Sequence, residues 1–203
     1  MWQLIIKGGP VMSILLLCSV YGLYIIIQKL LFIQANKIDY IAIKTHIKDQ
    51  LVNYGKEATI RNIRLNRHLV YRVIATAIKI SHLPKEDRED GLKEATYIEI
   101  PKLEKHMDIL AMIIKVAPIL GLFGTVLGLM DIFNVIAGGG IGDANALSGG
   151  IAEALITTVT GLGIAIPFMF AQQHLNRKID YFILDLERLT HEVVSFCRNQ
   201  LAK

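Results

Sequence analysis

Three long apolar stretches alternate with polar segments along this chain of 203 residues. The apolar stretches run from residue 8 to about 32, from 109 to 137 and from 150 to 171. Each is long enough for a transmembrane helix, which needs about 20 mostly apolar residues. The pattern therefore predicts an all-α, polytopic membrane protein with three transmembrane helices.

Outside these stretches, apolar residues recur at helical spacing, as at Ile43 and Ile47, and the pattern after the third stretch continues to near Phe196. Pro84 and the charged run after it mark a turn between two helices. A further helix is expected to run into the second span, with Pro101 as a kink or boundary. Long helices are therefore expected outside the membrane.

The chain divides on this basis into six segments of one membrane domain. They are an N-terminal segment with the first transmembrane helix (1–33), a helical region (34–108), the second transmembrane helix (109–137), a loop (138–149), the third transmembrane helix (150–171) and a C-terminal helix (172–203).

The distribution of charge predicts the orientation of these segments. Fifteen of the 22 Lys and Arg residues lie between residues 34 and 115, whereas the loop 138–149 contains none. An excess of Lys and Arg marks cytoplasmic segments. We therefore expect the helical region and the C-terminus in the cytoplasm, and the loop and the N-terminus in the periplasm. The net charge of +4 is explained by this topology, so the expected surroundings are membrane lipids and no nucleic acid.

Small residues form a row on the second span. Gly121, Gly124 and Gly128 lie one helical turn apart, and the last two have the spacing at which membrane helices pack closely. We interpret them as helix-packing residues. Pro118, near the inner end of the same span, predicts a kink.

Polar side chains inside lipid-length helices are costly and usually functional. Thr125, Thr157, Thr158 and Thr160 fall near mid-membrane, where each either bonds to a carbonyl one turn earlier or lines a polar pathway. Glu153 begins the third span, where it either reaches water at the outer surface or faces a water-filled lumen.

For Asp131, also near the outer end, the interfacial interpretation is preferred. Threonines at matched depth on two adjacent helices favour a polar lining, with Glu153 toward its outer end.

Sequence patterns of enzymes and metal sites are missing from the chain. It contains no HExxH, no GxSxG and no phosphate-binding loop, and its six histidines are scattered. Its two cysteines have neither a disulfide framework nor metal-ligand spacing. We predict no enzymatic activity, no metal and no cofactor.

The segments APILGLFGTVLGLMDIF (117–133) and SGGIAEALITTVTGLGIAIP (148–167) resemble the paired signature of the MotA/TolQ/ExbB proton-channel family. Three spans, rather than the four of flagellar MotA stators, favour the ExbB/TolQ branch. The resemblance implies a homopentamer in the bacterial inner membrane, with a single-span ExbD/TolR-like partner in its central pore. Such a complex converts proton motive force into mechanical work for outer-membrane import or envelope maintenance, and a TonB- or TolA-like protein is a further expected partner.

The same resemblance assigns roles to individual residues. Thr125 matches the pore threonine of the second span, Glu153 the glutamate of the GIAEAL motif, and Thr158 the pore threonine of the third span. On an ideal helix Glu153 aligns with Thr157, while Thr158 points about 140° away, so both threonines stay candidates. Two alternative functions also stay open: a stator subunit of another proton-driven motor, and a membrane scaffold that conducts no protons.

Overall fold

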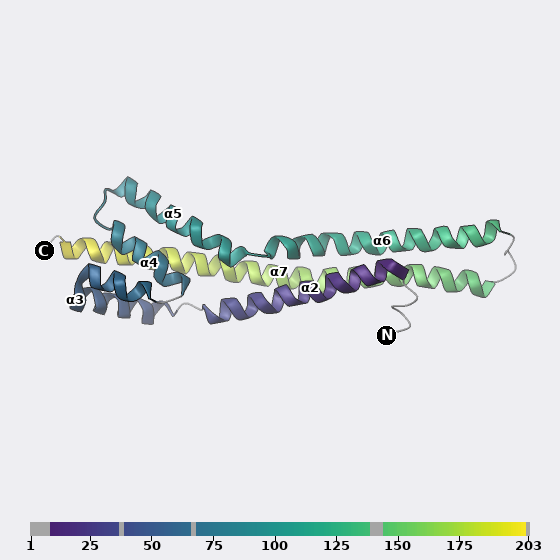
Figure 1. The fold of residues 1–203 in the computed structure, drawn as a ribbon, viewed down its shortest axis with the longest axis horizontal. Coiled ribbons are helices and arrows are strands. Elements are labelled where there is room, and N and C mark those ends of the chain that lie inside the picture. Colours follow the sequence, from purple (N-terminus) through teal and green to yellow (C-terminus); the bar gives the residue numbers. More distant parts are fainter. Residues whose placement is uncertain (1–8, 37–38, 66–67, 139–143, 202–203) are drawn as a thin grey trace. The chain divides into compact units, whose positions relative to one another are not determined.

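The computed structural model describes residues 9–36, 39–65, 68–138 and 144–201, and every regular element within them is an α-helix. The helices are α2 (Gly9–Ala35), α3 (Tyr40–Arg64), α4 (Leu69–Ile80), α5 (Lys85–Glu104), α6 (Met107–Ala137) and α7 (Ala144–Leu201), as drawn in Figure 1. The predicted all-α fold is confirmed.

Three of these helices are long and apolar enough to cross a membrane, which confirms the predicted number of spans. The qualifying segments are Gly9–Ala35, Met107–Asn134 and Gly149–Asn199. The last lies within α7, a single helix of 58 residues. The third span and the C-terminal helix are therefore one continuous element. Residues 172–201 contain neither Gly nor Pro, so the sequence has no helix-ending signal directly after the apolar stretch.

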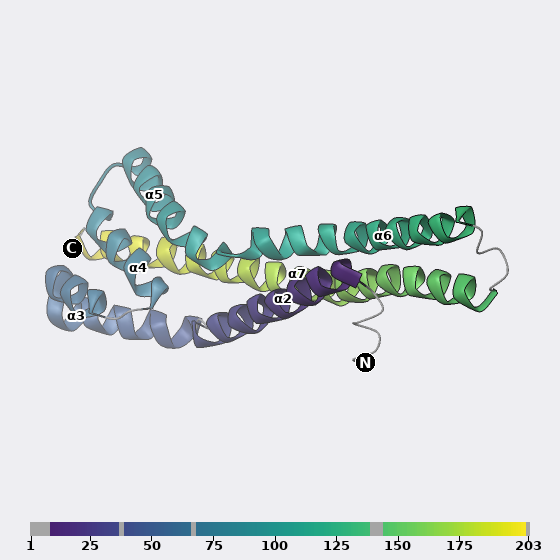
Figure 2. The ribbon, with the colours of Figure 1, turned by 45° about the vertical axis from the view of Figure 1, so that its right-hand side comes forward.

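The chain forms two compact units, of which the first contains residues 1–29 and 106–175. In this unit α2, α6 and the first half of α7 lie side by side, and α6 and α7 run antiparallel (Figure 1, Figure 2). One face of α2 is buried, including Leu15 and Ile25. A Cβ built onto Gly22 of α2 would overlap the ring of Phe168 of α7, so the glycine allows these two helices to touch.

The start of α6 differs from the expectation of a helix running into the second span. Pro101 lies inside α5, which continues to Glu104. The break comes at His106, whose φ of 69° places it in the left-handed region, where an L-residue interrupts a right-handed helix. Its ring Nδ1 lies 3.4 Å from Oε1 of Gln28, and its carbonyl oxygen accepts a hydrogen bond from the backbone N–H of Leu110 at 3.1 Å.

The second unit contains residues 30–105 and 176–203 and has its own apolar core. The amphipathic α4 buries Val73, Ile74 and Ala77. Ala77 packs in a cluster with Leu92 of α5 and Val194 of α7. The three helices are held together by burial of apolar area, as in a soluble helical bundle.

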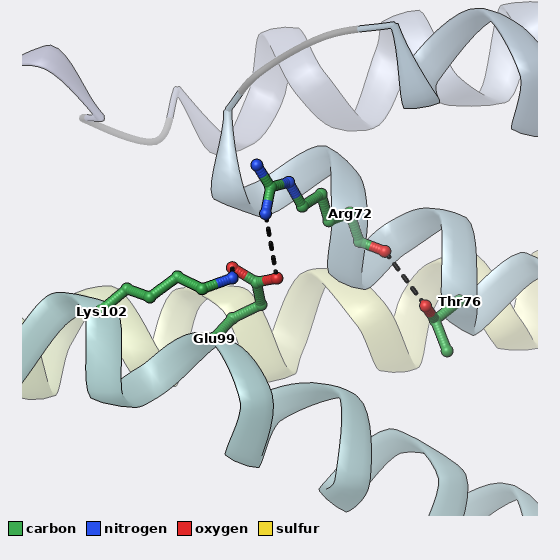
Figure 3. A network of polar contacts seen from close by, with 4 residues as sticks. All are labelled: Arg72, Thr76, Glu99 and Lys102. Atoms are coloured by element: carbon green, nitrogen blue, oxygen red, sulfur yellow. Dashed lines mark hydrogen bonds and ion pairs between the residues drawn. The ribbon is translucent and has the colours of Figure 1, made fainter.

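A buried carboxylate joins α4 to α5 within this unit (Figure 3). Glu99 is only 7% exposed, and its two oxygens lie 3.4 Å from Nη1 of Arg72 and 2.8 Å from Nζ of Lys102. Thr76 donates its hydroxyl hydrogen to the carbonyl oxygen of Arg72 at 3.2 Å. Because both cations are about half exposed, they keep part of their hydration while neutralising the carboxylate.

Replacing Glu99 should therefore destabilise the second unit. We expect Glu99→Ala to lower the free energy of unfolding by about 1–2 kcal/mol, less than for a fully buried pair, because the two cations can return to water. Glu94→Ala is the matched control, since Glu94 is exposed on the same helix. Thermal unfolding of the purified protein in detergent measures both variants, and equal effects would contradict the assigned role of Glu99.

Candidate functional site

Small residues line the contact between α6 and α7. A Cβ built onto Gly128 would lie 2.9 Å from the Cβ of Ala154, and one built onto Gly124 would lie 2.6 Å from Oγ1 of Thr157. A Cβ on Gly161 of α7 would overlap the carbonyl oxygen of Ala117 of α6. The backbones therefore approach closely along what we call the seam: Ala117, Gly121, Gly124 and Gly128 of α6 with Ala154, Thr157, Thr158 and Gly161 of α7.

Gly161 was not among the sequence candidates, although a Cβ built there would overlap the backbone of α6 at Ala117. A signal for it was present, because Gly161 follows Thr157 by four residues and precedes Ala165 by four, the spacing of a small-residue row. The third span therefore has a small-residue row that matches the one on the second span.

Thr157 lies inside the seam. It is 2% exposed, and its hydroxyl oxygen lies 2.7 Å from the carbonyl oxygen of Ala154 and 3.0 Å from that of Gly121. Its one hydrogen is thus shared between its own helix and α6. The structure gives Thr157 a position between the two helices.

Thr158, the next residue of α7, also donates a hydrogen bond to the carbonyl oxygen of Gly121. Its hydroxyl donates to the carbonyl oxygen of Gly121 at 3.0 Å, and the side chain is partly exposed. Gly121 O therefore accepts from two threonine hydroxyls of α7. Interhelical hydrogen bonds of this kind contribute about 0.6–2 kcal/mol each in membranes.

Thr125 and Thr158 lie on the same flank of the seam. Thr125 follows the seam residue Gly124, and Thr158 follows the seam residue Thr157. One residue turns a side chain by about 100°, and in antiparallel helices the same step turns both side chains toward the same side. We call this side, with its two partly exposed hydroxyls, the threonine flank. Thr125 donates its own hydrogen to the carbonyl oxygen of Leu122 at 2.6 Å.

The remaining candidates are placed as follows. The backbone of Glu153 is in α7, but its side chain lies outside the described residues, as do residues 139–143 of the predicted loop. Asp131 is exposed near the end of α6, and α6 continues unbroken through Pro118. Thr160 donates to the carbonyl oxygen of Ile156 at 2.8 Å, within its own helix.

An ion-pair cluster in the second unit ties α3 to α7. Oε2 of Glu192 lies 2.5 Å from Nζ of Lys44, and the hydroxyl of Tyr40 donates to Oε1 of Glu192 at 2.6 Å. The hydrogen bond to Glu192 raises the pKa of Tyr40 and that of Lys44. The hydrogen bonds from Lys44 and Tyr40 lower the pKa of Glu192 below its usual value of 4.5.

Cys197 and Ser81 are two further buried groups of the second unit. Cys197 is fully buried, and burial raises the pKa of its thiol, so that the neutral form is kept. Ser81 beside it accepts a hydrogen bond from Nζ of Lys56 at 3.2 Å and donates to the carbonyl oxygen of Ile78 at 2.8 Å. Within the described part of the chain, no group of three or more His, Cys, Asp or Glu residues is arranged to hold a metal ion.

These features define a multi-pass membrane protein in which a polar flank runs along a tightly packed pair of apolar helices. The model of the MotA/TolQ/ExbB proton channel family matches residues 62–188, more than half of the chain and the whole of the seam. The chain therefore belongs to the MotA/TolQ/ExbB proton channel family. The family consists of channels, so the protein is not an enzyme.

Individual relatives agree with the family match. The chain is 30% identical over 93% of its length to the biopolymer transport protein ExbB-like 1 of Synechocystis sp., covering 78% of that protein. It is 27% identical over 86% of its length to an ExbB homolog of Methanothermobacter thermautotrophicus, covering 62% of it. It is 35% identical over 50% of its length to the Tol-Pal system protein TolQ of Haemophilus influenzae, covering 45% of it. The chain thus spans less than two thirds of the length of the last two.

A methyl group at Gly161 should separate the two helices. We expect Gly161→Ala to lower the free energy of unfolding by about 1–3 kcal/mol, because its Cβ would overlap the backbone of α6. Gly163→Ala is the matched control, since a Cβ there meets nothing within 4 Å and improves helix propensity by about 1 kcal/mol. Unfolding in mixed detergent micelles measures both, and a harmless Gly161→Ala would show that the seam is looser than described.

The Glu192 cluster should make the protein sensitive to acid. A carboxyl group whose folded-state pKa is lowered contributes stability above its unfolded pKa, and this contribution is lost as the pH falls through the folded value. We therefore expect Glu192→Gln to lower the melting temperature at pH 7 by more than at pH 3. Because the side chains of Lys44 and Glu192 are partly exposed to solvent, the difference should be small. Glu187→Gln, at an exposed position of α7 five residues earlier, is the control, and an equal pH dependence in both variants would rule the cluster out as its source.

Proposed function

We propose that this chain is the channel subunit of an ExbB/TolQ-like complex that couples proton flow to mechanical work through an ExbD/TolR-like partner. The observation that carries the proposal is the threonine flank. Thr125 and Thr158 are partly exposed hydroxyls near the middle of two membrane helices, held in place by a seam that permits little movement. Polar groups at this depth are retained where they line an ion pathway.

The composition of the spans supports the need for a partner. Residues 118–127 and 155–165 contain no Asp, Glu, His, Lys or Arg. A proton relay through a membrane normally uses ionisable side chains. A second chain would therefore supply a carboxyl group beside the threonine flank. The loop predicted between the second and third spans has only about a dozen residues, so mechanical output would leave through the partner's periplasmic domain.

Several copies of the chain would be needed to surround such a partner. The threonine flank of one chain forms only one side of a pore. The large apolar side chains exposed on α6 and α7 also need contact with lipid or with neighbouring copies. We propose a homopentamer with the partner's helix in its centre. Within it Thr125 and Thr158 would face the lumen, Glu153 would draw protons at the outer mouth, and Thr157 would hold the wall together.

The orientation follows from the distribution of charge. We propose that the N-terminus and the segment 138–149 face the periplasm, while the second unit and the C-terminus lie in the cytoplasm. The complex would reside in the cytoplasmic membrane and act on an outer-membrane system through a TonB- or TolA-like protein. A stator of another motor would share the threonine flank, whereas a non-conducting scaffold would not need it.

Removal of the hydroxyls tests the function. In liposomes containing the complex purified with its native partner, we expect Thr125→Val and Thr158→Val to lower proton flux about tenfold, because each loses one hydrogen-bonding group from the pathway. Glu153→Ala should be at least as damaging. Thr160→Val is the control, since Thr160 points about 160° away from Thr158 around α7. Full flux in all variants, or a native complex that conducts no protons, would leave the scaffold as the better explanation.

Labelling of single cysteines tests the orientation. In a chain carrying Cys18→Ser and Cys197→Ala, we expect Gly140→Cys to react with a membrane-impermeant thiol reagent in intact spheroplasts. Lys79→Cys, at an exposed position of α4, should react only after the membrane is permeabilised. The reverse labelling pattern would overturn the proposed topology.

A further inference from the structure

Both hydroxyls of the threonine flank already donate their hydrogens to backbone carbonyl oxygens. Thr125 donates to the carbonyl oxygen of Leu122 at 2.6 Å, and Thr158 donates to that of Gly121 at 3.0 Å. A threonine hydroxyl has one hydrogen and two lone pairs. The side of each hydroxyl oxygen that faces the flank can therefore accept a hydrogen bond but has none to donate.

The arrangement resists rotation of these hydroxyls. The acceptor of Thr158 is on the other helix of the seam, and the neighbouring Thr157 donates to the same carbonyl oxygen. Turning the hydrogen of Thr158 toward the flank would break its bond to the carbonyl oxygen of Gly121 on the other helix.

We propose that Thr125 and Thr158 form a hydrogen-bond-accepting surface that selects an undissociated carboxylic acid over a carboxylate. The inference rests on the proposed function, which brings a partner's carboxyl group to this flank. The O–H of a carboxylic acid can donate to either hydroxyl oxygen. A carboxylate has only acceptors, so its oxygens would meet lone pairs with no hydrogen between them.

This polarity assigns a new role to two residues of the seam. Thr157 and the carbonyl group of Gly121 are positioning residues, because they fix the direction in which the hydroxyl of Thr158 points. A partner's acid stays neutral while it faces the flank, and it releases its proton only where water or a donor group takes the place of the threonines. Proton release is therefore coupled to movement of the acid away from this level of the pore.

Carbonyl chemical shifts test the direction of the hydroxyls without any partner. The full chain, carrying ¹³C-labelled glycine and leucine carbonyls, is examined in lipid bilayers by solid-state NMR. We expect Thr158→Val and Thr157→Val each to move the Gly121 resonance while leaving Leu122 in place. Thr125→Val should move Leu122 and leave Gly121 in place, so each variant is a control for the other. Unmoved resonances in the valine variants would overturn the proposal.

The pH dependence of proton flux tests the selection. In the complex purified with its native partner, Thr158→Asn introduces N–H donors on the flank, which favour the carboxylate. The pH midpoint of flux should fall by about one unit, a tenfold change in proton affinity, whereas Thr158→Ser should stay close to the wild type.

An unchanged or raised midpoint in Thr158→Asn would overturn the selection of the acid. This outcome is distinct from failure of the proposed function. If the proposed function fails, the wild-type complex conducts no protons at any pH. The carbonyl shifts then decide by themselves in which direction the threonine hydroxyls donate.

Discussion

The carbonyl oxygen of Ala117 on α6 and the Cα of Gly161 on α7 come so close that no side chain fits between them. From this contact the other features of the site follow. Only at this separation can the hydroxyls of Thr157 and Thr158 reach across to Gly121 O. Those two bonds fix the rotation of α7 about its axis, and this rotation places Thr158 on the same flank as Thr125.

The lipid surroundings explain why the seam is built from glycine and threonine. Lipid tails are as apolar as leucine, so membrane helices gain little by burying large side chains and depend on close packing and polar contacts. The second unit is stabilised mainly by burial of apolar side chains, as in a soluble protein. There, α4 and α5 bury apolar side chains, and a carboxylate such as Glu99 is tolerated because two hydrated cations neutralise it. One chain thus contains two units stabilised by different physics.

Most of the fold was accessible from the sequence, because length, apolar composition and periodicity are strong signals for membrane helices. The positions of helix breaks and the contacts between helices could not be predicted from the sequence. The helix break at His106 depends on a left-handed backbone conformation that no sequence pattern predicts. Pro101, which the sequence favoured as the kink or boundary, lies inside α5. The four mid-membrane threonines were found from their depth. Their hydrogen-bond acceptors could not be predicted, because the position of Thr157 in the seam depends on the rotation of α7 relative to α6.

The contact between α6 and α7 can be tested in native membranes by disulfide formation. In a chain lacking Cys18 and Cys197, Gly128→Cys combined with Ala154→Cys should form a bond within one chain on mild oxidation. A Cβ at Gly128 lies 2.9 Å from that of Ala154, and a separation of the helices by about 1 Å brings the pair to the usual disulfide distance. Gly128→Cys combined with Leu155→Cys is the control, since Leu155 is exposed away from the seam. Rapid intrachain crosslinking of the first pair alone is the result that this account predicts. Crosslinking of the control pair instead, or of neither, would contradict it.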